Sequence, residues 1–354
     1  MSSITKRDNG KWRARYRDAA GKEHARHFAR KVDAQAWLDE VTTAVGTGTY
    51  VDPKTARMTV GDWCDTWLAG YRTRRASTVR QAEVHIAKIR EAFDSVRMGD
   101  LKPSQVRSWS ATLKADGYAD STVYALHARL SQIMSDAVHD GVIARNPCSR
   151  RTSPRAGKQR PYVATTEQVW ALHDAMPAHL RPAVLLGAFA GLRIAEACGL
   201  RLSDVDFMRG IVAPEVQYPA EPLKSEMART AIPIPSELSL ELSRYATGER
   251  WMLEDVLGAQ VKPFQIERAV RAARGPASLP DGFRFHDLRH YFASLLIGAG
   301  CDVKVVQTRL RHASATTTLN TYAHLWPETE ESTRAAVAGV LTARADSLRT
   351  GEAS

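Results

Sequence analysis

The chain has 354 residues, more than one hydrophobic core usually serves, so two or three domains are expected. Its 49 Lys and Arg against 39 Asp and Glu give a net charge of +10, which favours an anionic partner such as nucleic acid or an acidic membrane surface. A protein that is merely basic and soluble is the alternative. With no apolar run of about 18 residues and no hydrophobic N-terminal core, neither a membrane span nor a signal peptide is expected.

The cysteines also limit the class of protein. They lie far apart and form no Cys-x-x-Cys pair, which argues against a zinc ribbon and against a disulfide framework. We expect reduced thiols in protein cores and a cytoplasmic location. The four positions are Cys64, Cys148, Cys198 and Cys301.

Residues 1–55 are predicted to form a small basic module. The stretch KWRARYRD alternates strictly between apolar and basic side chains, which is the period of a half-buried strand. Asn9-Gly10 predicts a hairpin turn before it, Gly21 marks a second turn, and EHARHF predicts a third strand. The apolar side chains of the alternating stretch are Trp12, Ala14 and Tyr16, and the basic ones are Lys11, Arg13, Arg15 and Arg17.

A helix is predicted to follow, from a cap at Asp33 to a stop near Gly46, with Trp37, Val41 and Val45 on its inner face. A basic ribbon backed by one helix can lie against a DNA groove, which makes the four basic side chains candidate DNA contacts. The alternative is an ordinary solvated charged face.

Residues 59–148 are predicted to form a compact bundle of four amphipathic helices. The helices are expected to begin at caps on Thr59, Ser77 and Ser121 and at Pro103, and Gly141 ends the last one. Asn146-Pro147 then breaks the chain. Residues 149–164 are rich in Arg, Ser, Pro and Gly and are predicted to be a flexible basic linker.

Residues 165–330 are predicted to be mostly helical with a small sheet. GIVAPEVQ and RTAIPIP are expected to be strands that flank a turn containing Lys224. The tail, residues 331–354, carries Val337, Val340 and Leu341 at helical spacing, and these side chains could pack on a neighbouring subunit or on their own domain.

The stretch RFHDLRHYF, residues 284–292, raises the question of a metal site. His286 and His290 are four residues apart, so on a helix both imidazoles share one face and could bind zinc. Arg289 lies on the same turn, however, and a guanidinium repels a dication. Asp287 is also one methylene shorter than the Glu that acts as general base in such enzymes, and it is better suited to cap the helix.

Four stretches of the third unit carry a pattern that is more specific. They contain G-L-R-x-x-E, a Lys in a predicted hairpin, H-x-x-R, and a His ten residues before the Tyr of T-T-x-x-x-Y. In this order and spacing the chain resembles the tyrosine recombinases, the integrase family of site-specific DNA recombinases. The stretches are AGLRIAEACGLRLSDV, PLKSEMARTAIPIP, FRFHDLRHYFASLL and LRHASATTTLNTYAHL.

The resemblance spans nearly the whole chain and implies a mainly α fold with small β-sheets (α+β) in three domains. The basic module resembles an arm-site DNA-binding domain of phage integrases, the bundle resembles a core-site-binding domain, and the third unit resembles the catalytic domain. By this resemblance, the six catalytic positions are Arg193, Lys224, His286, Arg289, His312 and Tyr322.

The residue types suit the breaking and rejoining of a DNA phosphodiester. Tyr322 can attack phosphorus and hold the 3′ phosphate, provided that cationic neighbours favour its phenolate. Arg193 and Arg289 would hold the non-bridging oxygens, and Lys224 would protonate the leaving 5′ oxygen. His286 suits general base or proton-shuttle duty. Because the covalent intermediate stores the bond, no cofactor is expected, neither metal nor ATP.

The remaining residues of these stretches are expected either to support the catalytic set or to be alternative candidates for nucleophile and proton donor. His312 suits a hydrogen bond to the phosphate, Glu196 would buttress Arg193, and His290 would support the site from outside the minimal set. Tyr291 competes as nucleophile but has the apolar neighbours of a core residue, and Lys304 is a weak competitor of Lys224.

The sequence departs from the family pattern in two places. Ala190 stands where the family commonly has Thr, and Arg311 stands where it usually has Gly before the His. Neither change removes a catalytic atom. Arg311 either adds a phosphate contact or alters the backbone turn.

The resemblance also implies partners: double-stranded DNA with core-type and arm-type attachment sites, further copies of the chain in a tetrameric synapse, a host DNA-bending protein and a phage directionality factor. The expected place of action is the nucleoid of a bacterial host. A type IB topoisomerase and a catalytically inactive DNA-binding regulator of the same fold are the alternatives. The basic module argues against the first, and the full set of six residues argues against the second.

Overall fold

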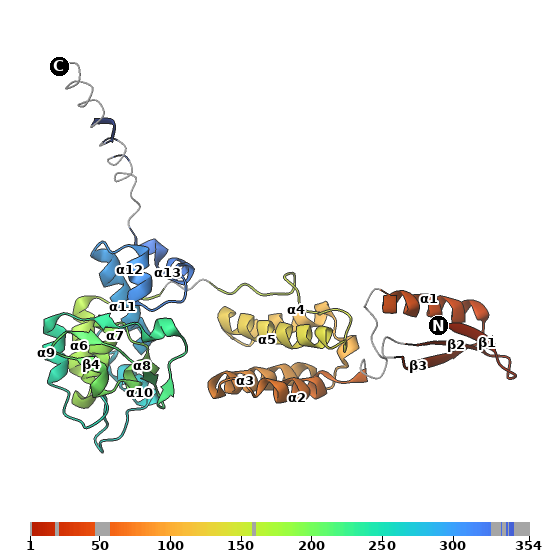
Figure 1. Cartoon of the computed structure of the whole chain (residues 1–354), viewed down its shortest axis with the longest axis horizontal. Coiled ribbons are helices and arrows are strands. Elements are labelled where there is room, and N and C mark those ends of the chain that lie inside the picture. The colour runs from red at the N-terminus through yellow and green to blue at the C-terminus, as the bar shows by residue number, and fades with distance from the viewer. Residues whose placement is uncertain are drawn as a thin grey trace. The chain divides into compact units, whose positions relative to one another are not determined.

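The structure is a computed structural model, and it describes residues 2–17, 21–46, 57–157, 161–326, 334, 338 and 340–342. The chain divides into two compact units, Met1–Lys158 and Gln159–Ser354 (Figure 1). The predicted α+β class with a mainly helical chain and small antiparallel sheets is confirmed. In the part of the chain that the structure describes, no helix has the length and apolar character needed to cross a membrane.

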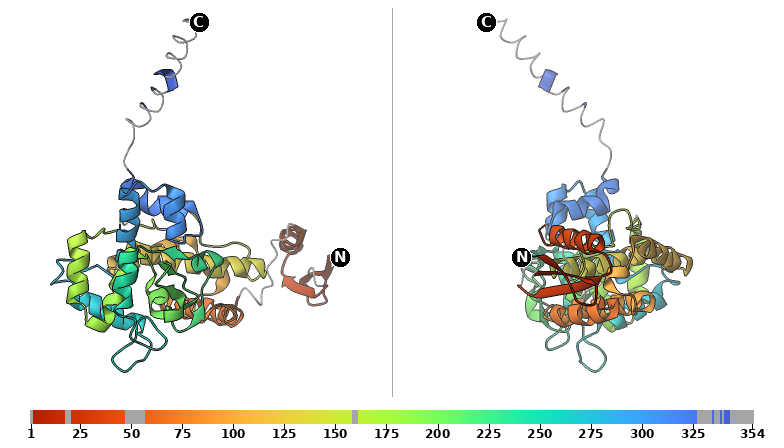
Figure 2. Two further views of the ribbon diagram at one scale, coloured as in Figure 1. Left: turned by 60° about the vertical axis from the view of Figure 1, so that its left-hand side comes forward. Right: turned by 90° about the vertical axis from the view of Figure 1, so that its right-hand side faces the viewer.

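The first unit begins with an antiparallel sheet in the order β1-β2-β3, whose strands are Ser3–Lys6, Trp12–Arg17 and Glu23–Phe28. Helix α1, Lys31–Gly46, lies across one face of this sheet (Figures 1 and 2). The predicted alternation is confirmed, because Ala14 and Tyr16 are buried while Arg15 and Arg17 are exposed. The predicted cap at Asp33 is wrong: α1 begins at Lys31, and the Asp33 carboxylate instead accepts hydrogen bonds from the Arg30 guanidinium at 3.0 Å.

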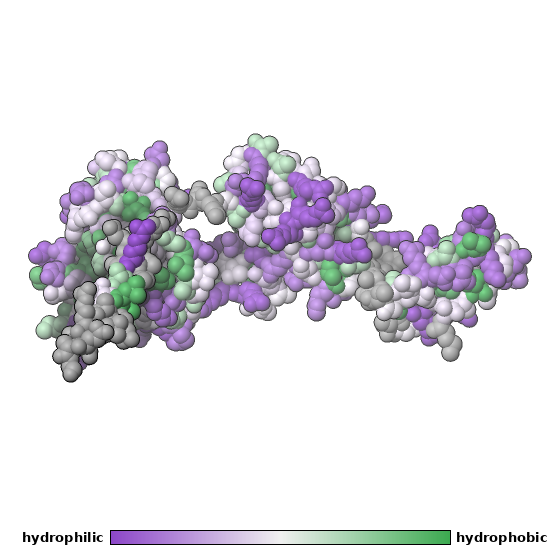
Figure 3. Space-filling view, turned by 90° about the horizontal axis from the view of Figure 1, so that it is seen from above, coloured by the Kyte–Doolittle hydropathy of each residue, from purple (hydrophilic) through white to green (hydrophobic). Residues whose placement is uncertain are grey.

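Four helices follow in the first unit: α2 Val60–Tyr71, α3 Ala76–Phe93, α4 Pro103–Ala115 and α5 Asp120–His139. Thr59 caps α2 as predicted, and Asp62 completes a capping box with it. The caps predicted at Ser77 and Ser121 are wrong, since α3 and α5 begin at earlier residues and include both serines in their first turns. Hydrophilic side chains cover much of the visible surface of this unit in the space-filling view (Figure 3).

Tryptophans tie the bundle together from inside. The indole Nε1 of Trp63 donates to the carbonyl of Ile133 at 3.0 Å, which joins α2 to α5. Beyond α5, the prediction of a flexible linker is wrong for its first residues. Thr152 is buried, and its hydroxyl lies 3.0 Å from Nε2 of His127 on α5, so this part of the segment packs on the bundle.

The second unit places helices around two small sheets. Strands β4, β5 and β8 form one antiparallel sheet, and β6 and β7 form a hairpin. The stretch GIVAPEVQ, predicted as one strand, forms two, because Pro214 between them has no N–H to donate to a ladder. The strands are Val205–Asp206, Ile211–Val212, Val216–Gln217, Glu221–Pro222 and Ile232–Pro233.

Helices α7 and α11 pack against each other in the core of this unit. Gly187 on α7 permits their close approach, because an added Cβ would lie 3.0 Å from both Phe285 and Leu288. The helices are α6 Thr166–Ala175, α7 Arg181–Phe189, α8 Ile194–Gly199, α9 Ser236–Ser243, α10 Pro263–Ala273, α11 Phe285–Gly298, α12 Val303–Arg309 and α13 Ala315–Tyr322.

The remaining predictions concern the cysteines and the tail. All four cysteines are free; three are buried and Cys301 is half-buried, as expected of reduced thiols. In the tail, Val337 lies outside the described residues. Val340 and Leu341 are 72% and 65% exposed, so in this structure these two side chains do not pack on their own domain.

Candidate active site

A pocket of roughly 460 Å³ in the second unit gathers several predicted catalytic residues. Arg193 reaches it from the start of α8, Lys224 from the segment after β7, and His286 from the first turn of α11. Glu196 and Arg311 line the same pocket. Residues as far apart in the sequence as Glu196 and Arg311, which are separated by 115 positions, therefore converge on one cavity.

Arg193 is held by a buried carboxylate. Its backbone N–H donates to Oε2 of Glu196 at 2.9 Å, and its guanidinium Nη1 donates to Oε1 at 2.8 Å. Glu196 is only 3% exposed. Burial raises the pKa of the Glu196 carboxyl, but Arg311 and Arg193 outweigh it, so that pKa lies below its ordinary value. Glu196 therefore remains charged and orients the Arg193 side chain, as predicted.

Arg289, on α11, has only 1% of its surface exposed. Its guanidinium donates to the backbone carbonyls of Gly191 and Leu310. Gly191 has φ +62°, and a Cβ there would lie 2.4 Å from the ring of Phe292, which explains the glycine before Leu-Arg. Burial lowers the pKa of Arg289 to about 9, and the nearby Arg193 acts in the same direction.

Tyr322 ends α13 and is 1% exposed. Its hydroxyl lies 2.6 Å from Nδ1 of His290, and its ring stacks parallel to that of His312, with centroids 6.4 Å apart. Burial raises the pKa of Tyr322 to about 12, against the opposing effect of Arg289 and Arg193. Arg289 and Arg193 thus favour the phenolate as expected, but in the DNA-free protein burial outweighs them and the pKa of Tyr322 stays above its ordinary value.

The three histidines of the site are neutral at pH 7. Burial lowers the pKa of His290 and of His312 to about 4, and neighbouring positive groups add to the shift. The pKa of His286 is also lowered, by partial desolvation in the pocket and then by Arg289. Nδ1 of His312 lies 2.9 Å from the hydroxyl of Thr318, which leaves Nε2 for another partner.

The zinc interpretation of this helix gains no support. His290 directs Nδ1 at Tyr322, and within the described residues no three His, Cys, Asp or Glu side chains lie close enough together to hold a metal ion. Asp287 caps α11 as predicted, because its carboxylate accepts the backbone N–H of Arg284 at 2.6 Å. His290 was expected only to support the site, yet it contacts the predicted nucleophile directly.

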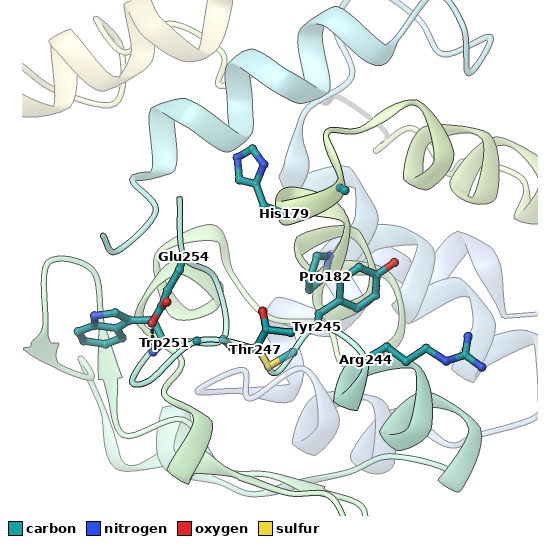
Figure 4. Close-up of a pocket in the computed structure, with 10 residues that line it drawn as sticks. His179, Pro182, Arg244, Tyr245, Thr247, Trp251 and Glu254 are labelled. Carbon is teal, nitrogen blue, oxygen red and sulfur yellow. Dashed lines mark hydrogen bonds between the residues drawn. The ribbon is translucent and has the colours of Figure 1, made fainter. Parts of the chain in front are cut away.

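The alternative candidates for nucleophile and proton donor lie away from the pocket. Tyr291 is 3% exposed and its hydroxyl lies 3.0 Å from that of Thr166, so it is a core residue as predicted. Lys304 lies on α12, where its Nζ hydrogen-bonds Gln307 at 3.3 Å, whereas Lys224 is exposed at the pocket. A smaller pocket of roughly 230 Å³ has a separate lining that includes Tyr245, Trp251 and Glu254 (Figure 4).

The candidate DNA contacts in the first unit share one acidic neighbour. The guanidinium groups of Arg13, Arg15 and Arg17 lie 3.3, 3.7 and 4.0 Å from the carboxylate of Glu23 on the adjacent strand β3. Lys11 is exposed just before β2. These four residues form a basic row on the face of the sheet opposite to the buried Ala14 and Tyr16.

Two family models match the chain. Residues 163–329 match the phage integrase family, and residues 2–46 match the N-terminal domain of phage integrases. The chain is 28% identical over 338 residues to a putative prophage phiRv2 integrase of Mycobacterium tuberculosis, covering 87% of each chain. It is 24% identical over 359 residues to a tyrosine recombinase XerC-like protein of Caldanaerobacter subterraneus subsp. tengcongensis, covering 88% of this chain and 91% of the other.

Solved structures share the fold. The Tn1549 transposon integrase in complex with transposon right end DNA superposes with a TM-score of 0.70 at 18% identity, covering 80% of this chain and 100% of the other. A lambda integrase dimer bound to a COC′ core site gives 0.62 at 20% identity, covering 92% and 97%.

Fold, motif set and site together define an enzyme that breaks and rejoins DNA at specific sites. The chain belongs to the phage integrase family and is a tyrosine-type site-specific recombinase. The topoisomerase and inactive-regulator alternatives are not favoured.

Proposed function

We propose that this recombinase integrates phage DNA into a bacterial chromosome, and carries out the reverse excision, through 3′-phosphotyrosine intermediates. The observation that carries the proposal is the position of the Tyr322 hydroxyl, 2.6 Å from a neutral histidine and within the electrostatic influence of Arg289 and Arg193. No other tyrosine in the described second unit combines these neighbours.

In the proposed cleavage step, the phenol oxygen of Tyr322 forms a bond to phosphorus while the bond from phosphorus to the 5′ oxygen breaks. The phenol proton passes to Nδ1 of His290, which accepts it in the tautomer that carries the ring proton on Nε2. Lys224 donates a proton to the departing 5′ oxygen. Rejoining reverses each transfer, with the 5′ hydroxyl of the partner strand as the attacking group.

The remaining groups stabilise charge on the phosphate. Arg193 faces the pocket and places a permanent charge there, fixed by Glu196. Arg289 adds positive potential from its buried position on α11. His312 offers Nε2 as a hydrogen-bond donor, and His286 at the mouth of the pocket relays protons between the phosphate and solvent.

The substrate is DNA with two kinds of site. The basic row on β2 would contact arm-type sites, while the helical bundle and the second unit would bind core-type sites. The net charge of +10 supports a polyanionic partner. A host DNA-bending protein and a phage directionality factor would bring arm and core sites together in the nucleoid.

Four copies would form the synapse in which strands are exchanged. The exposed Val340 and Leu341 would pack on a neighbouring copy there. A lambda integrase of the same fold is known as a tetramer bound to a Holliday junction, with a TM-score of 0.61 and 20% identity to this chain.

Two experiments, carried out one after the other, test the proposal. Purified protein is first incubated with fragmented phage and host DNA, and the retained fragments are sequenced to find the attachment sites. Linear DNAs that carry one site each are then mixed with the protein, supplemented with host extract. Joint molecules with exchanged arms are expected, whereas relaxation of supercoiled DNA without any strand joining would contradict the proposal and favour a topoisomerase.

A further inference from the structure

The backbone conformation of Arg311 and the burial of its charge are both unfavourable. Its φ is +52°, in the left-handed region that a side chain with a Cβ rarely adopts, and its side chain is fully buried. Within the described residues, its Nε finds no hydrogen-bond partner. A buried guanidinium in a strained backbone is unfavourable unless its contacts compensate.

Those contacts join two parts of the active site. Nη2 of Arg311 donates to Oε2 of Glu196 at 2.6 Å, and Nη1 donates to the carbonyl of Ala228 at 3.1 Å. Glu196 is the carboxylate that holds Arg193. Ala228 lies in a short 3-10 helix, Glu226–Arg229, only four residues after Lys224.

The link to Lys224 is short and partly fixed. Ser225, the next residue, caps the 3-10 helix by accepting the backbone N–H of Ala228 at 3.3 Å. Among the described hydrogen bonds, the one from Nη1 of Arg311 to Ala228 is the only side-chain bond from the rest of the pocket to residues 224–229. On the other side of Lys224, the Gln217 side chain donates to the carbonyl of Pro222 at 3.3 Å. Lys224 itself is exposed, and its direction into the pocket depends on where this turn is held.

We propose that Arg311 is a positioning residue that fastens the Lys224 turn to the Glu196–Arg193 pair, so that the proton donor and the phosphate-binding arginine are assembled as one unit. This inference rests on the proposed role of Lys224 as the acid that protonates the 5′ oxygen. A planar guanidinium can donate hydrogen bonds in two directions at once, which suits this task. The glycine that is usual at this position has no side chain to hydrogen-bond the turn.

The test uses a DNA in which sulfur replaces the 5′ bridging oxygen at the scissile phosphate. A thiol such as that of cysteine has a pKa of about 8.5, so a thiolate departs without a proton donor, and the loss of a general acid is rescued by this substrate. The full-length chain is assayed on suicide substrates built from the core site that the retention experiment identifies. Cleavage rates are compared between ordinary and sulfur-substituted DNA.

For Arg311→Gly we expect cleavage of ordinary DNA to fall about 10²-fold. Most of that loss should be recovered on the sulfur-substituted DNA, and Lys224→Ala should show the same recovery. Arg193→Ala should lose activity on both DNAs. Arg311→Lys keeps the charge but has a single donor group and should behave like Arg311→Gly. Arg274→Ala is the matched control, because it also removes a hydrogen bond from an arginine to a backbone carbonyl. Nε of Arg274 donates to the carbonyl of Phe283 at 2.7 Å, outside the pocket. This control should cleave both DNAs at wild-type rates.

Two results would overturn the inference alone: wild-type cleavage by Arg311→Gly, or equal losses on both DNAs while Lys224→Ala is rescued. Should Arg311→Gly fail to fold, equal losses for the folded Arg311→Lys would overturn it in the same way. If Lys224→Ala is not rescued, Lys224 is not the acid and the inference falls with that role. Absence of any covalent product from the wild-type chain would instead contradict the proposed function itself.

Discussion

Nδ1 of His290 lies 2.6 Å from the phenol oxygen of Tyr322, and both groups are neutral in the DNA-free protein. Burial has placed a proton acceptor directly against the proposed nucleophile while it suppresses the charge on each. The pair is therefore poised for proton transfer only when the phosphate and its negative charge arrive, since that charge favours the imidazolium that transfer creates.

His290→Asn tests this arrangement. The Asn side chain offers an oxygen near the position of Nδ1, so it keeps a hydrogen bond to Tyr322 but cannot carry the proton. We expect cleavage of a core-site suicide substrate to fall roughly 10²-fold with DNA binding unchanged. A wild-type cleavage rate for this variant would show that another group, such as His286, accepts the proton.

The stability of the protein should depend on pH through the same histidines. The folded-state pKa values of His290 and His312 are about 4, below the value near 6.5 of an unfolded chain. Between these values the unfolded state binds more protons, so their contribution is fully present above pH 6.5 and is lost as pH falls towards 4. Each histidine should contribute about 1–2 kcal/mol.

Thermal unfolding of the full chain at pH 7.5 and pH 5 measures this effect. His312→Asn should show a smaller loss between the two pH values than the wild type does. His139→Asn, at an exposed position on α5, is the control and should match the wild type. An identical loss for all three proteins would contradict the assignment to the site histidines.

Glu196→Gln should be strongly destabilising. This change leaves the buried Arg311 and the half-buried Arg193 without their shared counter-charge, and breaking a buried ion pair in this way costs about 3–5 kcal/mol. Glu241→Gln removes a carboxylate from a pair with the exposed Arg244 and should cost under ~1 kcal/mol. Urea unfolding measures the free energy of unfolding of both variants. Similar small losses would mean that the charge of Glu196 does not stabilise the buried arginines.

Gly191→Ala should affect both stability and catalysis. The new methyl group would collide with Phe292, and the shift would displace the carbonyl that accepts from Arg289. We expect a loss of about 2–3 kcal/mol and slower cleavage. Gly258→Ala has a similar positive φ of +75° with open space around it, so only the backbone cost of about 1 kcal/mol should appear. Equal losses for the two variants would rule out the collision.

The basic row on β2 should contribute to DNA affinity in a salt-dependent way. Arg15→Gln and Arg17→Gln should each reduce the slope of log affinity against log salt by about 1, because each removes one phosphate contact. Glu23→Gln should strengthen binding, since the carboxylate now competes with phosphate for three guanidiniums. Binding titrations of the full chain at several salt concentrations measure these slopes, and unchanged slopes would leave the row as a solvated face.

Local signals predicted much of the fold. The cap at Thr59 and the alternation along β2 depend on residues close together in the sequence, and both were predicted correctly. Ser77 and Ser121 were placed wrongly, because α3 and α5 begin at Ala76 and Asp120 without a side-chain hydrogen bond from the residue that precedes each helix. The six predicted catalytic positions could be named because their spacing is specific, and three of them, Arg193, Lys224 and His286, line one pocket.

Properties that depend on tertiary contact could not be predicted. Arg311 and Glu196 are 115 residues apart in the sequence, so no local sequence pattern predicts their ion pair. The only signal was an arginine where glycine is usual. The raised pKa of Tyr322 likewise depends on how deeply α13 is buried, which the charges in the motif do not reveal.

The most direct test of the account is covalent trapping on a nicked core-site suicide substrate, followed by proteolysis and mass spectrometry of the DNA-linked peptide. The account predicts a 3′-phosphate linked to Tyr322, and no covalent complex with Tyr322→Phe. A complex that survives in Tyr322→Phe, or one that maps to Tyr291, would contradict it.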